Sequence, residues 1–363
     1  MKALASFCLF LATMFLDETS LAQKIYLSPA GSDSNPGTPE SPLATLNAAV
    51  SMARTIREAG QMKVQAEITV LDGEYMMLRP LELGAADGGT AGAPLVIRGE
   101  AGKKPVFRGG VMIGGWETAG NNIWRAFVPQ AAWYDSYFEQ LYVNGRRAVR
   151  ARTPNAGFYT VKSVTETVHE KGGGRSPEFA VQKIFLDSAD ARCFRSFTQQ
   201  DYNDALVVFY HKWDNTRKRV EYFSRSESCI YTSGTGMKPW NSIDGKSRWF
   251  VENYREALDS PGEWFLDRSG YIYYIPLEGE TIGNTSFYAP ILDKLVIISG
   301  ESNQKKAANI KFENLVFSVS GYRTPPGGND PAQAAAPVDA AVTLDYADNI
   351  SFTGCEISHT GTY

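Results

Sequence analysis

Residues 309–321 read Asn309-Ile310-Lys311-Phe312-Glu313-Asn314-Leu315-Val316-Phe317-Ser318-Val319-Ser320-Gly321, and residues 349–361 read Asn349-Ile350-Ser351-Phe352-Thr353-Gly354-Cys355-Glu356-Ile357-Ser358-His359-Thr360-Gly361. The two stretches align without gaps. We predict that four aligned pairs point inward: Ile310/Ile350, Phe312/Phe352, Leu315/Cys355 and Phe317/Ile357. The apolar phase shifts at Asn314/Gly354, as it does at a corner between two strands. Equivalent residues of successive windings then stack in one apolar column, and each backbone group pairs with the next winding. The repeat therefore predicts an all-β fold, a parallel β-helix.

The segment between the two repeats is longer than one winding requires. The excess lies between Tyr322 and Ala341, where Pro and Gly recur beside an alanine run. We expect a long surface loop that leaves one corner of the winding. Long loops on a rigid scaffold often carry function. A tolerated insertion explains this loop equally well, and the sequence leaves both explanations open.

Residues 23–114 are predicted to form an N-terminal cap and the first windings. An amphipathic helix is expected, with Ser41 as its cap, Pro42 at its first position and Gly60 at its end. We expect its apolar face to cover the open end of the windings; that face comprises Leu43, Leu46, Val50, Ala53 and Ile56. Short strands are predicted at residues 67–71, 94–98 and 105–108, with a turn at residues 72–75.

Residues 115–280 break this rhythm and are predicted to form an inserted antiparallel β domain. Asn144-Gly145 between two apolar runs is typical of a type I′ hairpin turn. Further strands are expected at residues 206–211 and 219–223, and a second hairpin at residues 263–275. The windings are predicted to resume within residues 281–363, near residue 295. The chain ends just past a strand without a capping element, so we expect this β-helix to be incomplete.

The first 22 residues are predicted to be a secretory signal peptide. Lys2 precedes an apolar run, and Ser20 and Ala22 supply the small residues of a cleavage site. The run is too short to span a bilayer stably, and no later run is long enough. We therefore expect an exported protein, periplasmic or extracellular, with no membrane span. The formal net charge of −4 implies no basic face for nucleic acid.

The cysteines that follow the leader give no metal motif. Cys193, Cys229 and Cys355 allow one disulfide at most, and Cys193–Cys229 is the pair that the sequence leaves open. Their spacing fits no zinc site. Residues 172–174 are three glycines, but no strand-to-helix context surrounds them, so we predict a flexible loop instead of a phosphate cradle. No cofactor and no metal are predicted.

Two segments resemble a known family. The opening 26–33, with 35–38 and 42–46, is similar to the start of many secreted β-helix carbohydrate enzymes. Residues 252–267, including Leu258-Asp259-Ser260-Pro261-Gly262-Glu263-Trp264-Phe265-Leu266-Asp267, together with Tyr273-Tyr274-Ile275-Pro276, resemble the junction where an inserted domain returns to the helix in glycoside hydrolase family 141.

This resemblance implies a right-handed parallel β-helix with an N-terminal capping helix and an inserted antiparallel β domain. It also implies hydrolysis of glycosidic bonds in plant-type polysaccharides, including fucosidase or xylanase activity. The catalytic carboxylates of such a protein are expected on windings beyond residue 363, so none is assigned here. We expect no turnover from this chain alone.

Three residues near the C-terminus are the candidate cleft residues. His359 stands where the previous winding has Val319, so it either binds a sugar group or is bonded within a corner. Asp345 and Glu356 are expected to face outward, because their strand neighbours point inward. Each either lines a cleft or is a solvated surface acid. Hydrolysis of a glycosidic bond usually needs two carboxylates that face the same bond.

Other polar residues have simpler explanations. Asp339 and Asp348 are predicted to lie at corners and to form turns. His169 and His211 show no partner pattern. Trp213 either stacks on a sugar or, as we expect, packs at a strand end.

Three functions fit these patterns. The first is a glycoside hydrolase, which rests on the resemblance. The second is a polysaccharide lyase of the pectate-lyase kind, which would need calcium-binding acids and a basic residue on one face. The third is a non-catalytic, carbohydrate-binding surface protein. The fold does not separate them, and each has a polysaccharide or oligosaccharide as its partner.

Overall fold

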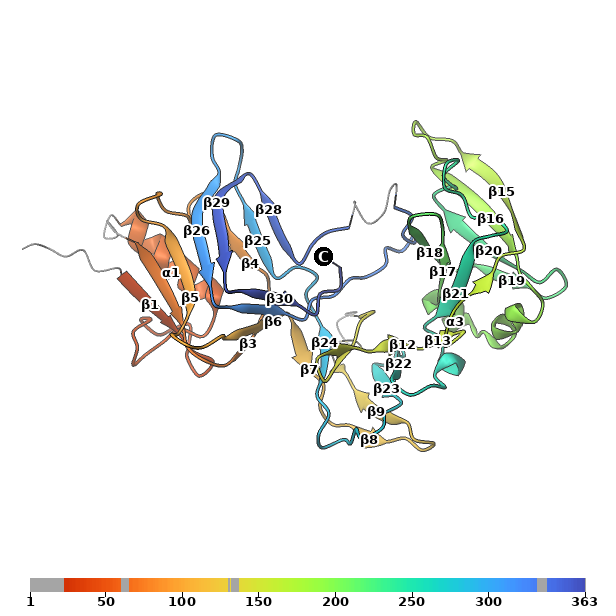
Figure 1. Cartoon of the computed structure of the whole chain (residues 1–363), viewed down its shortest axis with the longest axis horizontal. Helices are drawn as coiled ribbons and strands as arrows, with labels where there is room; N and C mark the ends of the chain where they lie inside the picture. The colour runs from red at the N-terminus through yellow and green to blue at the C-terminus, as the bar shows by residue number, and fades with distance from the viewer. Residues whose placement is uncertain (1–22, 60–64, 130, 132–136, 332–337, 363) are drawn as a thin grey trace, which may run out of the picture.

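The computed structural model describes residues 23–59, 65–129, 131, 137–331 and 338–362. The predicted leader and Gly60, the predicted helix end, lie outside these residues. Figure 1 shows two parts: a parallel part that carries both ends of the described chain, and an inserted part made of β7 to β24. Most described elements are strands, so the all-β prediction is confirmed.

The parallel part consists of three sheets whose strands all pair in parallel. The first sheet contains β1 (Gln23–Leu27), β2 (Ala66–Val70), β5 (Leu95–Gly99), β26 (Ala307–Glu313) and β29 (Ala347–Thr353). The second contains β3 (Glu74–Met76), β6 (Val106–Arg108), β27 (Val316–Ser318) and β30 (Glu356–Ser358). The third contains β4 (Leu81–Leu83), β25 (Val296–Ser299) and β28 (Val342–Asp345).

The chain visits these sheets in a fixed order. After β1, strands β2, β3 and β4 lie in the first, second and third sheets, and β5 and β6 begin the next round. The inserted part then follows β6. After it, β25 completes the interrupted round in the third sheet. Strands β26, β27 and β28 form the following round. The inserted part therefore interrupts one winding between its second and third sheets.

The predicted stacking of the two repeats is confirmed. Ile310 pairs with Ile350 and Phe312 with Phe352 in the first sheet, and Phe317 pairs with Ile357 in the second. The backbone takes positive φ at Asn314 and Gly354 alike, which places a corner at the predicted phase shift. Ile357 keeps its inward register, yet 44% of it is exposed because β30 is an edge strand.

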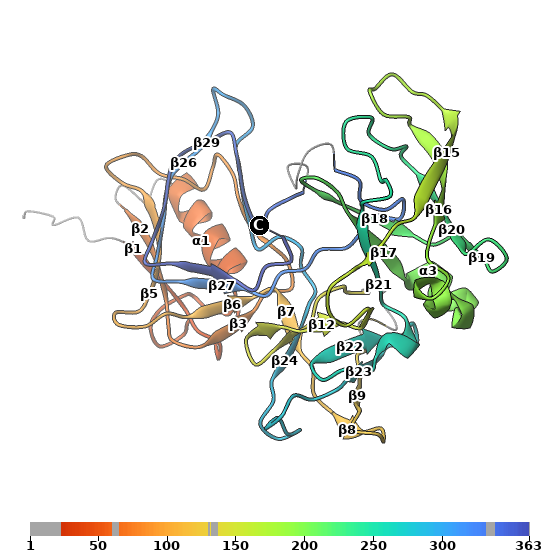
Figure 2. The ribbon, with the colours of Figure 1, turned by 45° about the vertical axis from the view of Figure 1, so that its right-hand side comes forward.

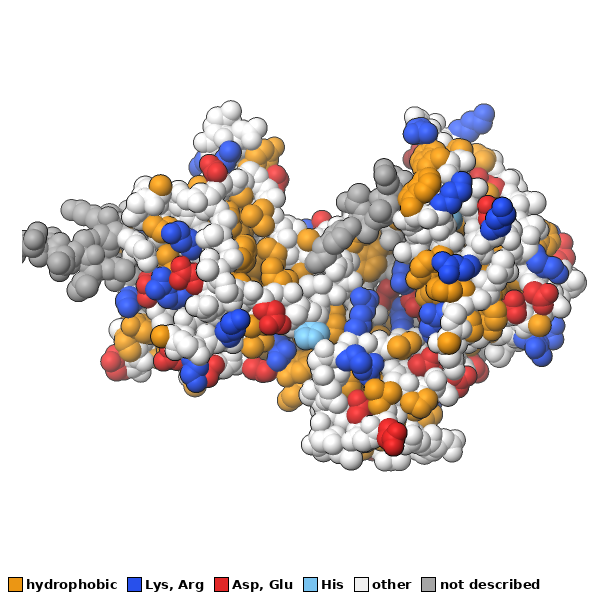
Figure 3. Space-filling model, in the orientation of Figure 1, with side chains coloured by type: hydrophobic (Ala, Val, Ile, Leu, Met, Phe, Trp, Pro, Cys, Tyr) orange, Lys and Arg blue, Asp and Glu red, His pale blue; other side chains and the backbone are white. Residues whose placement is uncertain are grey.

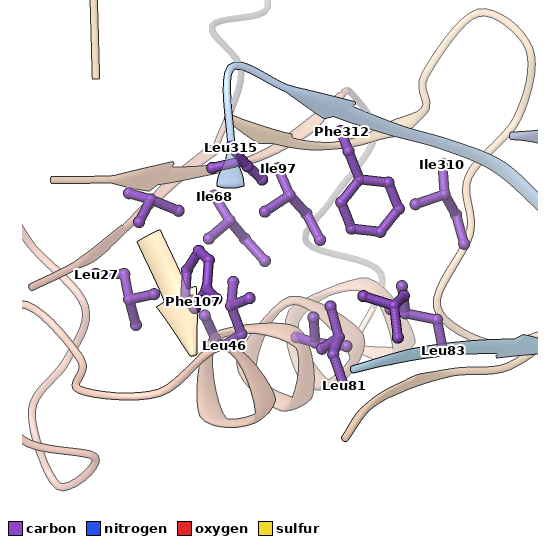
Figure 4. Close-up of a cluster of buried hydrophobic side chains, with 14 of the residues drawn as sticks. Leu27, Leu46, Ile68, Leu81, Leu83, Ile97, Phe107, Ile310, Phe312 and Leu315 are labelled. Atoms are coloured by element: carbon purple, nitrogen blue, oxygen red, sulfur yellow. The ribbon is translucent and has the colours of Figure 1, made fainter. Parts of the chain in front are cut away.

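Aromatic rings continue the column through the parallel part. Phe107 stacks between Tyr75, with centroids 4.8 Å apart, and Phe317, at 5.5 Å. Phe312 stacks on Phe352 at 4.5 Å. Figure 4 shows how the surrounding side chains converge from all three sheets and from helix α1 (Leu46–Glu58); it labels Leu27, Leu46, Ile68, Leu81, Leu83, Ile97, Phe107, Ile310, Phe312 and Leu315. This core fixes the register of the windings.

Helix α1 begins later than the sequence predicts. Its N-cap is Thr45, whose hydroxyl accepts a hydrogen bond from the backbone N–H of Ala48. Ser41 is therefore not the cap. The Asp33 carboxylate accepts the N–H groups of Ala44 and Thr45 at 3.0 and 2.8 Å, which holds this segment extended. The apolar face of the helix still packs on the core, against β1, β2 and β4.

The inserted part holds four sheets. Its strands are β7 (Gly110–Met112), β8 (Glu117–Thr118), β9 (Trp124–Phe127), β10 (Tyr142–Val143), β11 (Arg146–Arg147), β12 (Val149–Arg150), β13 (Arg152–Thr153), β14 (Tyr159–Thr160), β15 (Ser163–Glu170), β16 (Phe179–Phe185), β17 (Leu206–Tyr210), β18 (Asn215–Arg219), β19 (Tyr222–Ser224), β20 (Cys229–Gly234), β21 (Arg248–Glu252), β22 (Glu263–Leu266), β23 (Tyr271–Tyr274) and β24 (Phe287–Pro290). The helices η1 (Asp190–Ser196), α3 (Gln199–Asp204) and η2 (Arg255–Ala257) are short.

Both predicted hairpins of the inserted part are present. β10 and β11 pair antiparallel around Asn144 and Gly145, whose φ values of 48° and 72° suit a type I′ turn. β22 and β23 pair antiparallel around residues 267–270. All pairs here are antiparallel except β12 with β22, which makes that sheet mixed.

Some local predictions were wrong. Glu74 and Tyr75 lie in strand β3 instead of a turn. The reason is that β3 pairs with β6, and the Tyr75 ring stacks on the Phe107 ring of β6. Asp348 lies inside β29 instead of at a corner. The cysteines Cys193, Cys229 and Cys355 are all free thiols, so the Cys193–Cys229 pair is not bonded.

We expect Phe312→Ala to lower the free energy of unfolding by about 3–5 kcal/mol, because it empties a fully buried site between the stacked Phe352 ring and the edge-on Phe317 ring. Chemical denaturation measures the loss. Lys311→Ala, on the same strand but half-buried, is the matched control and should change stability by less than about 0.5 kcal/mol. Equal losses in the two variants would contradict the stacked core.

Candidate functional site

A polar cleft of about 450 Å³ lies where the inserted part meets the C-terminal end of the described chain. The inserted part contributes most of its walls, and the remainder comes from residues 322–331 and 338–341, here called the arm, and from the last described residues. The lining residues are Glu139, Gln140, Arg147, Ala148, Arg150, Asn215, Arg217, Glu252, Tyr322, Asn329, Val338, Gly361 and Thr362. Figures 1 and 2 both place the C-terminal end between the two parts, and Figure 3 shows Lys and Arg side chains gathered in the hollow there.

The arm is held against the inserted part by backbone and side-chain hydrogen bonds. Gln140 donates to the Tyr322 carbonyl at 2.8 Å and accepts from the Tyr322 N–H at 2.6 Å. Asn329 exchanges two backbone hydrogen bonds of 2.8 Å with Arg217, so it extends the edge of strand β18. The predicted long loop is therefore an ordered part of the cleft wall along its described residues.

A buried lysine, Lys238, holds residues 330 and 331 of the arm. Lys238, with 3% of its side chain exposed, contacts Asp214 at 2.7 Å and Asp330 at 3.0 Å. It also donates to the Pro331 carbonyl at 2.6 Å. Thr216 donates to Asp330 as well. Because a buried cation needs nearby negative charge to offset its desolvation, this contact ties residues 330–331 to the inserted part.

Arg150 lies at the centre of the cleft charges. Its Nη1 atom lies 3.7 Å from Glu139 and 3.6 Å from Glu252, and only 6% of its side chain is exposed. Its Nε and Nη1 atoms are buried and find no hydrogen-bond acceptor among the described residues. Buried donors are normally satisfied, so Arg150 is an exception among the residues that line the cleft.

The two glutamates beside Arg150 have other partners. Glu252 accepts from Arg217 at 2.8 Å. Burial would raise the pKa of Glu252, but the positive charges of Arg217, Arg150 and Arg152 outweigh it and lower that pKa. Glu139 accepts from both the N–H and the hydroxyl of Thr324. Both carboxylates are therefore held in place by neighbouring groups.

The residues predicted from the sequence do not line this cleft. His359 bonds to the Gly145 carbonyl through Nε2 at 2.6 Å and to Ser318 through Nδ1 at 2.9 Å. It thus joins the last winding to the β10–β11 hairpin. Asp345 and Glu356 are exposed on edge strands of different sheets. The structure does not bring these three together in one pocket, and their roles stay predictions.

The other polar residues are placed as follows. Asp339 pairs with Lys294 at 3.0 Å. His211 bonds to Thr216, and burial lowers its pKa. Trp213 is 50% exposed in the turn between β17 and β18, so it does not pack at a strand end as expected. Within the described residues, no group of three or more His, Cys, Asp or Glu side chains could hold a metal.

Sequence reasoning missed the cleft because its walls come from distant segments. A signal was present: Arg150 follows apolar Ala148 and Val149, and Glu252 ends the apolar run of β21. A charged residue within an apolar strand is rarely buried without a partner.

Comparison with known proteins gives these parts a family context. Residues 121–277 match the family model of the GH141 insertion domain. A solved structure described as "Glycoside hydrolase" is 26% identical, with a TM-score of 0.77; the match covers 94% of this chain and 62% of that one. This chain thus spans less than two thirds of that protein's length. The resemblance to family 141 is confirmed.

More distant structures also align. One described as "The complex structure of XylC with xylose" is 13% identical, with a TM-score of 0.36, over 86% of this chain and 38% of that one. One described as "Rhamnogalacturonan lyase" is 22% identical, with a TM-score of 0.18, over 24% of this chain and 22% of that one. Neither is close enough to support an argument. No curated protein matches the chain.

The segment that matches the GH141 insertion domain also contains a buried carboxyl with a shifted pKa. Glu263 accepts hydrogen bonds from the backbone N–H groups of Arg152, Asp259 and Ser260 at 3.1–3.3 Å. Burial nevertheless raises its pKa to about 7. These bonds hold the backbone of Asp259 and Ser260, within the segment that carries the sequence resemblance, beside Arg152.

We expect the Lys238→Met variant to lose about 3–5 kcal/mol of stability, because Asp214 and Asp330 would stay buried without their cation. Chemical denaturation measures this loss. Lys183→Met is the matched control, since Lys183 pairs with Glu227 at the surface, where such a pair contributes at most about 1 kcal/mol. Similar losses in both variants would argue against a buried anchor.

We expect stability to fall as the pH rises from about 5 to 8, because Glu263 binds its proton more tightly in the folded chain than in the unfolded chain. Its contribution is complete below the ordinary glutamate pKa and is lost as the pH passes about 7. The effect is at most about 3 kcal/mol. Thermal unfolding of wild type and Glu263→Gln across this range measures it. An unchanged pH dependence in Glu263→Gln would exclude Glu263 as the source.

Proposed function

We propose that this chain is part of an exported carbohydrate-active enzyme, a glycoside hydrolase that acts on plant-type polysaccharides. The parallel part is proposed to be a set of windings of a right-handed parallel β-helix, with an inserted domain at residues 115–280. The helices that the structure describes are too short or too polar to cross a bilayer. Export itself rests on the predicted leader.

One observation carries the proposal. The cleft lies between the GH141 insertion domain and the last windings, and planar amide, guanidinium and carboxylate groups line it. Such groups donate to and accept from the closely spaced hydroxyls of a sugar ring. Tyr322 adds an aromatic ring to the same wall. The likeness to a glycoside hydrolase supports a saccharide as the ligand.

We further propose that the two cleft carboxylates position substrate and do not themselves cleave it. Hydrolysis needs one carboxyl that is protonated and can act as an acid. The lowered pKa of Glu252 keeps that group ionised. Glu139 is bonded to Thr324 and faces Arg150. This arrangement agrees with the expectation that the catalytic acids lie on other windings.

Product analysis tests the reaction. The full-length protein is incubated with xylan and with pectic polysaccharides, and we expect reducing sugars without ultraviolet-absorbing unsaturated ends. Unsaturated ends would instead identify a lyase, and saccharide binding without any product would identify a binding protein. Either result would overturn the proposed hydrolase.

Asn215→Ala tests the role of the cleft. The Asn215 amide lines the cleft and has no hydrogen-bond partner among the described side chains, so its loss should raise KM about threefold to tenfold, the effect of one neutral hydrogen bond. Asn203→Ala, an exposed residue of helix α3, is the matched control. An unchanged KM in Asn215→Ala would place the substrate elsewhere.

A further inference from the structure

The charges of the cleft do not balance. Three guanidinium groups line it, those of Arg147, Arg150 and Arg217, against the two carboxylates of Glu139 and Glu252. Beside the cleft, Lys294 pairs with Asp339 at 3.0 Å, and Arg323 pairs with Asp293 at 3.5 Å. One positive charge of the cleft is therefore left over.

Arg147 carries that excess charge. It makes no ion pair with a described residue, and its one hydrogen bond goes to the Gly361 carbonyl at 3.4 Å. A bond of this length is weak, so the guanidinium group of Arg147 keeps most of its donors for a ligand. Its neighbour Arg146 on the same strand points elsewhere, toward the Tyr274 hydroxyl at 3.3 Å.

Arg150 also has donors without an acceptor in the described part of the chain. Its distances of 3.6 and 3.7 Å to the two glutamates are longer than a charge-assisted hydrogen bond, and its buried Nε and Nη1 lack acceptors among the described residues. The glutamates take their hydrogen bonds from Arg217 and Thr324 instead. Arg147 and Arg150 thus line the same cleft, and each keeps donors that no described residue uses.

We propose that Arg147 and Arg150 bind the carboxylate of an acidic sugar residue, a uronate, within the substrate. This inference rests on the proposed function, in that the cleft receives a saccharide. A planar carboxylate matches the donor fork of a guanidinium group. It also neutralises the excess charge, which a neutral sugar hydroxyl does not.

Calorimetric titration of the protein tests this with two probes on the same sugar backbone, trigalacturonic acid and its fully methyl-esterified form, in which each carboxylate is replaced by a neutral ester. We expect the acid to bind at least about tenfold more tightly, since hydrogen bonds to charged groups are the stronger kind. Its affinity should fall as the salt concentration rises, and that of the ester should not.

Two substitutions on strand β11 test whether Arg147 causes the difference in affinity between the acid and the ester. Arg147→Gln should lower the affinity for the acid about tenfold, bring it close to that of the ester and remove the salt dependence. Arg146→Gln removes the same charge from the neighbouring position, outside the cleft, and should change neither probe's affinity. Arg150→Lys keeps the charge but loses the fork, and should weaken the acid more than the ester.

The outcomes separate this inference from the proposed function. Equal affinity for acid and ester, or equal effects of Arg146→Gln and Arg147→Gln, would overturn uronate recognition. Binding of neutral xylo-oligosaccharides alone would also overturn it, while the proposed saccharide site would stand. A protein that binds none of these probes would contradict both proposals.

Discussion

The ammonium group of Lys238 is the contact on which the cleft depends. It joins the turn before β18, through Asp214, to the arm, through Asp330 and the Pro331 carbonyl. A charge removed from water is tolerated only when its partners stay close, so Asp330 and Pro331 are held against the inserted part. Tyr322 and Asn329 of the same arm lie in the cleft wall.

A second constraint comes from the corners of the windings. Positive φ recurs at equivalent places of the two repeats: Asn309 and Asn349, Asn314 and Gly354, Val319 and His359. Asn and Gly adopt this conformation readily, whereas a β-branched residue adopts it at a cost. Val319 is accordingly buried, at 1% exposure, where packing against the core offsets that cost. Histidine at the same corner of the next winding is less strained and can use both ring nitrogens.

His359 shows how this corner geometry serves the whole molecule. Its Nε2 reaches the Gly145 carbonyl in the β10–β11 hairpin, while Nδ1 stays on Ser318 of the previous winding. The inserted part is thus bonded to the parallel part at the same hairpin that carries Arg147 into the cleft. These hydrogen bonds of His359 hold the hairpin beside the cleft, as the corner-bonded alternative expects, and its contact with a sugar stays a prediction.

The sequence predicted the features that depend on local periodicity. The alternation of apolar residues around Ile310 and Ile350 was enough to predict parallel stacking, and Asn144-Gly145 was enough to predict a hairpin. It missed what depends on contacts between distant residues. The start of helix α1 is set by Asp33, twelve residues before the Thr45 cap, and the cleft unites residues as far apart as 139 and 362. No spacing rule connects such positions, because their proximity follows from how the inserted part and the last winding pack together.

The unsatisfied donors of Arg150 are the strongest departure from ordinary folding rules in this cleft. Each buried donor without a partner costs about 1–3 kcal/mol, and a protein selected for stability alone would replace the group with an apolar side chain of similar size. Departures of this kind are expected where function requires them. Glu139 and Glu252 hold Arg150 in place through charge at longer range, while their own hydrogen bonds are used on Thr324 and Arg217. The arginine is therefore positioned before any ligand arrives, and the free energy of binding need not be spent on ordering it.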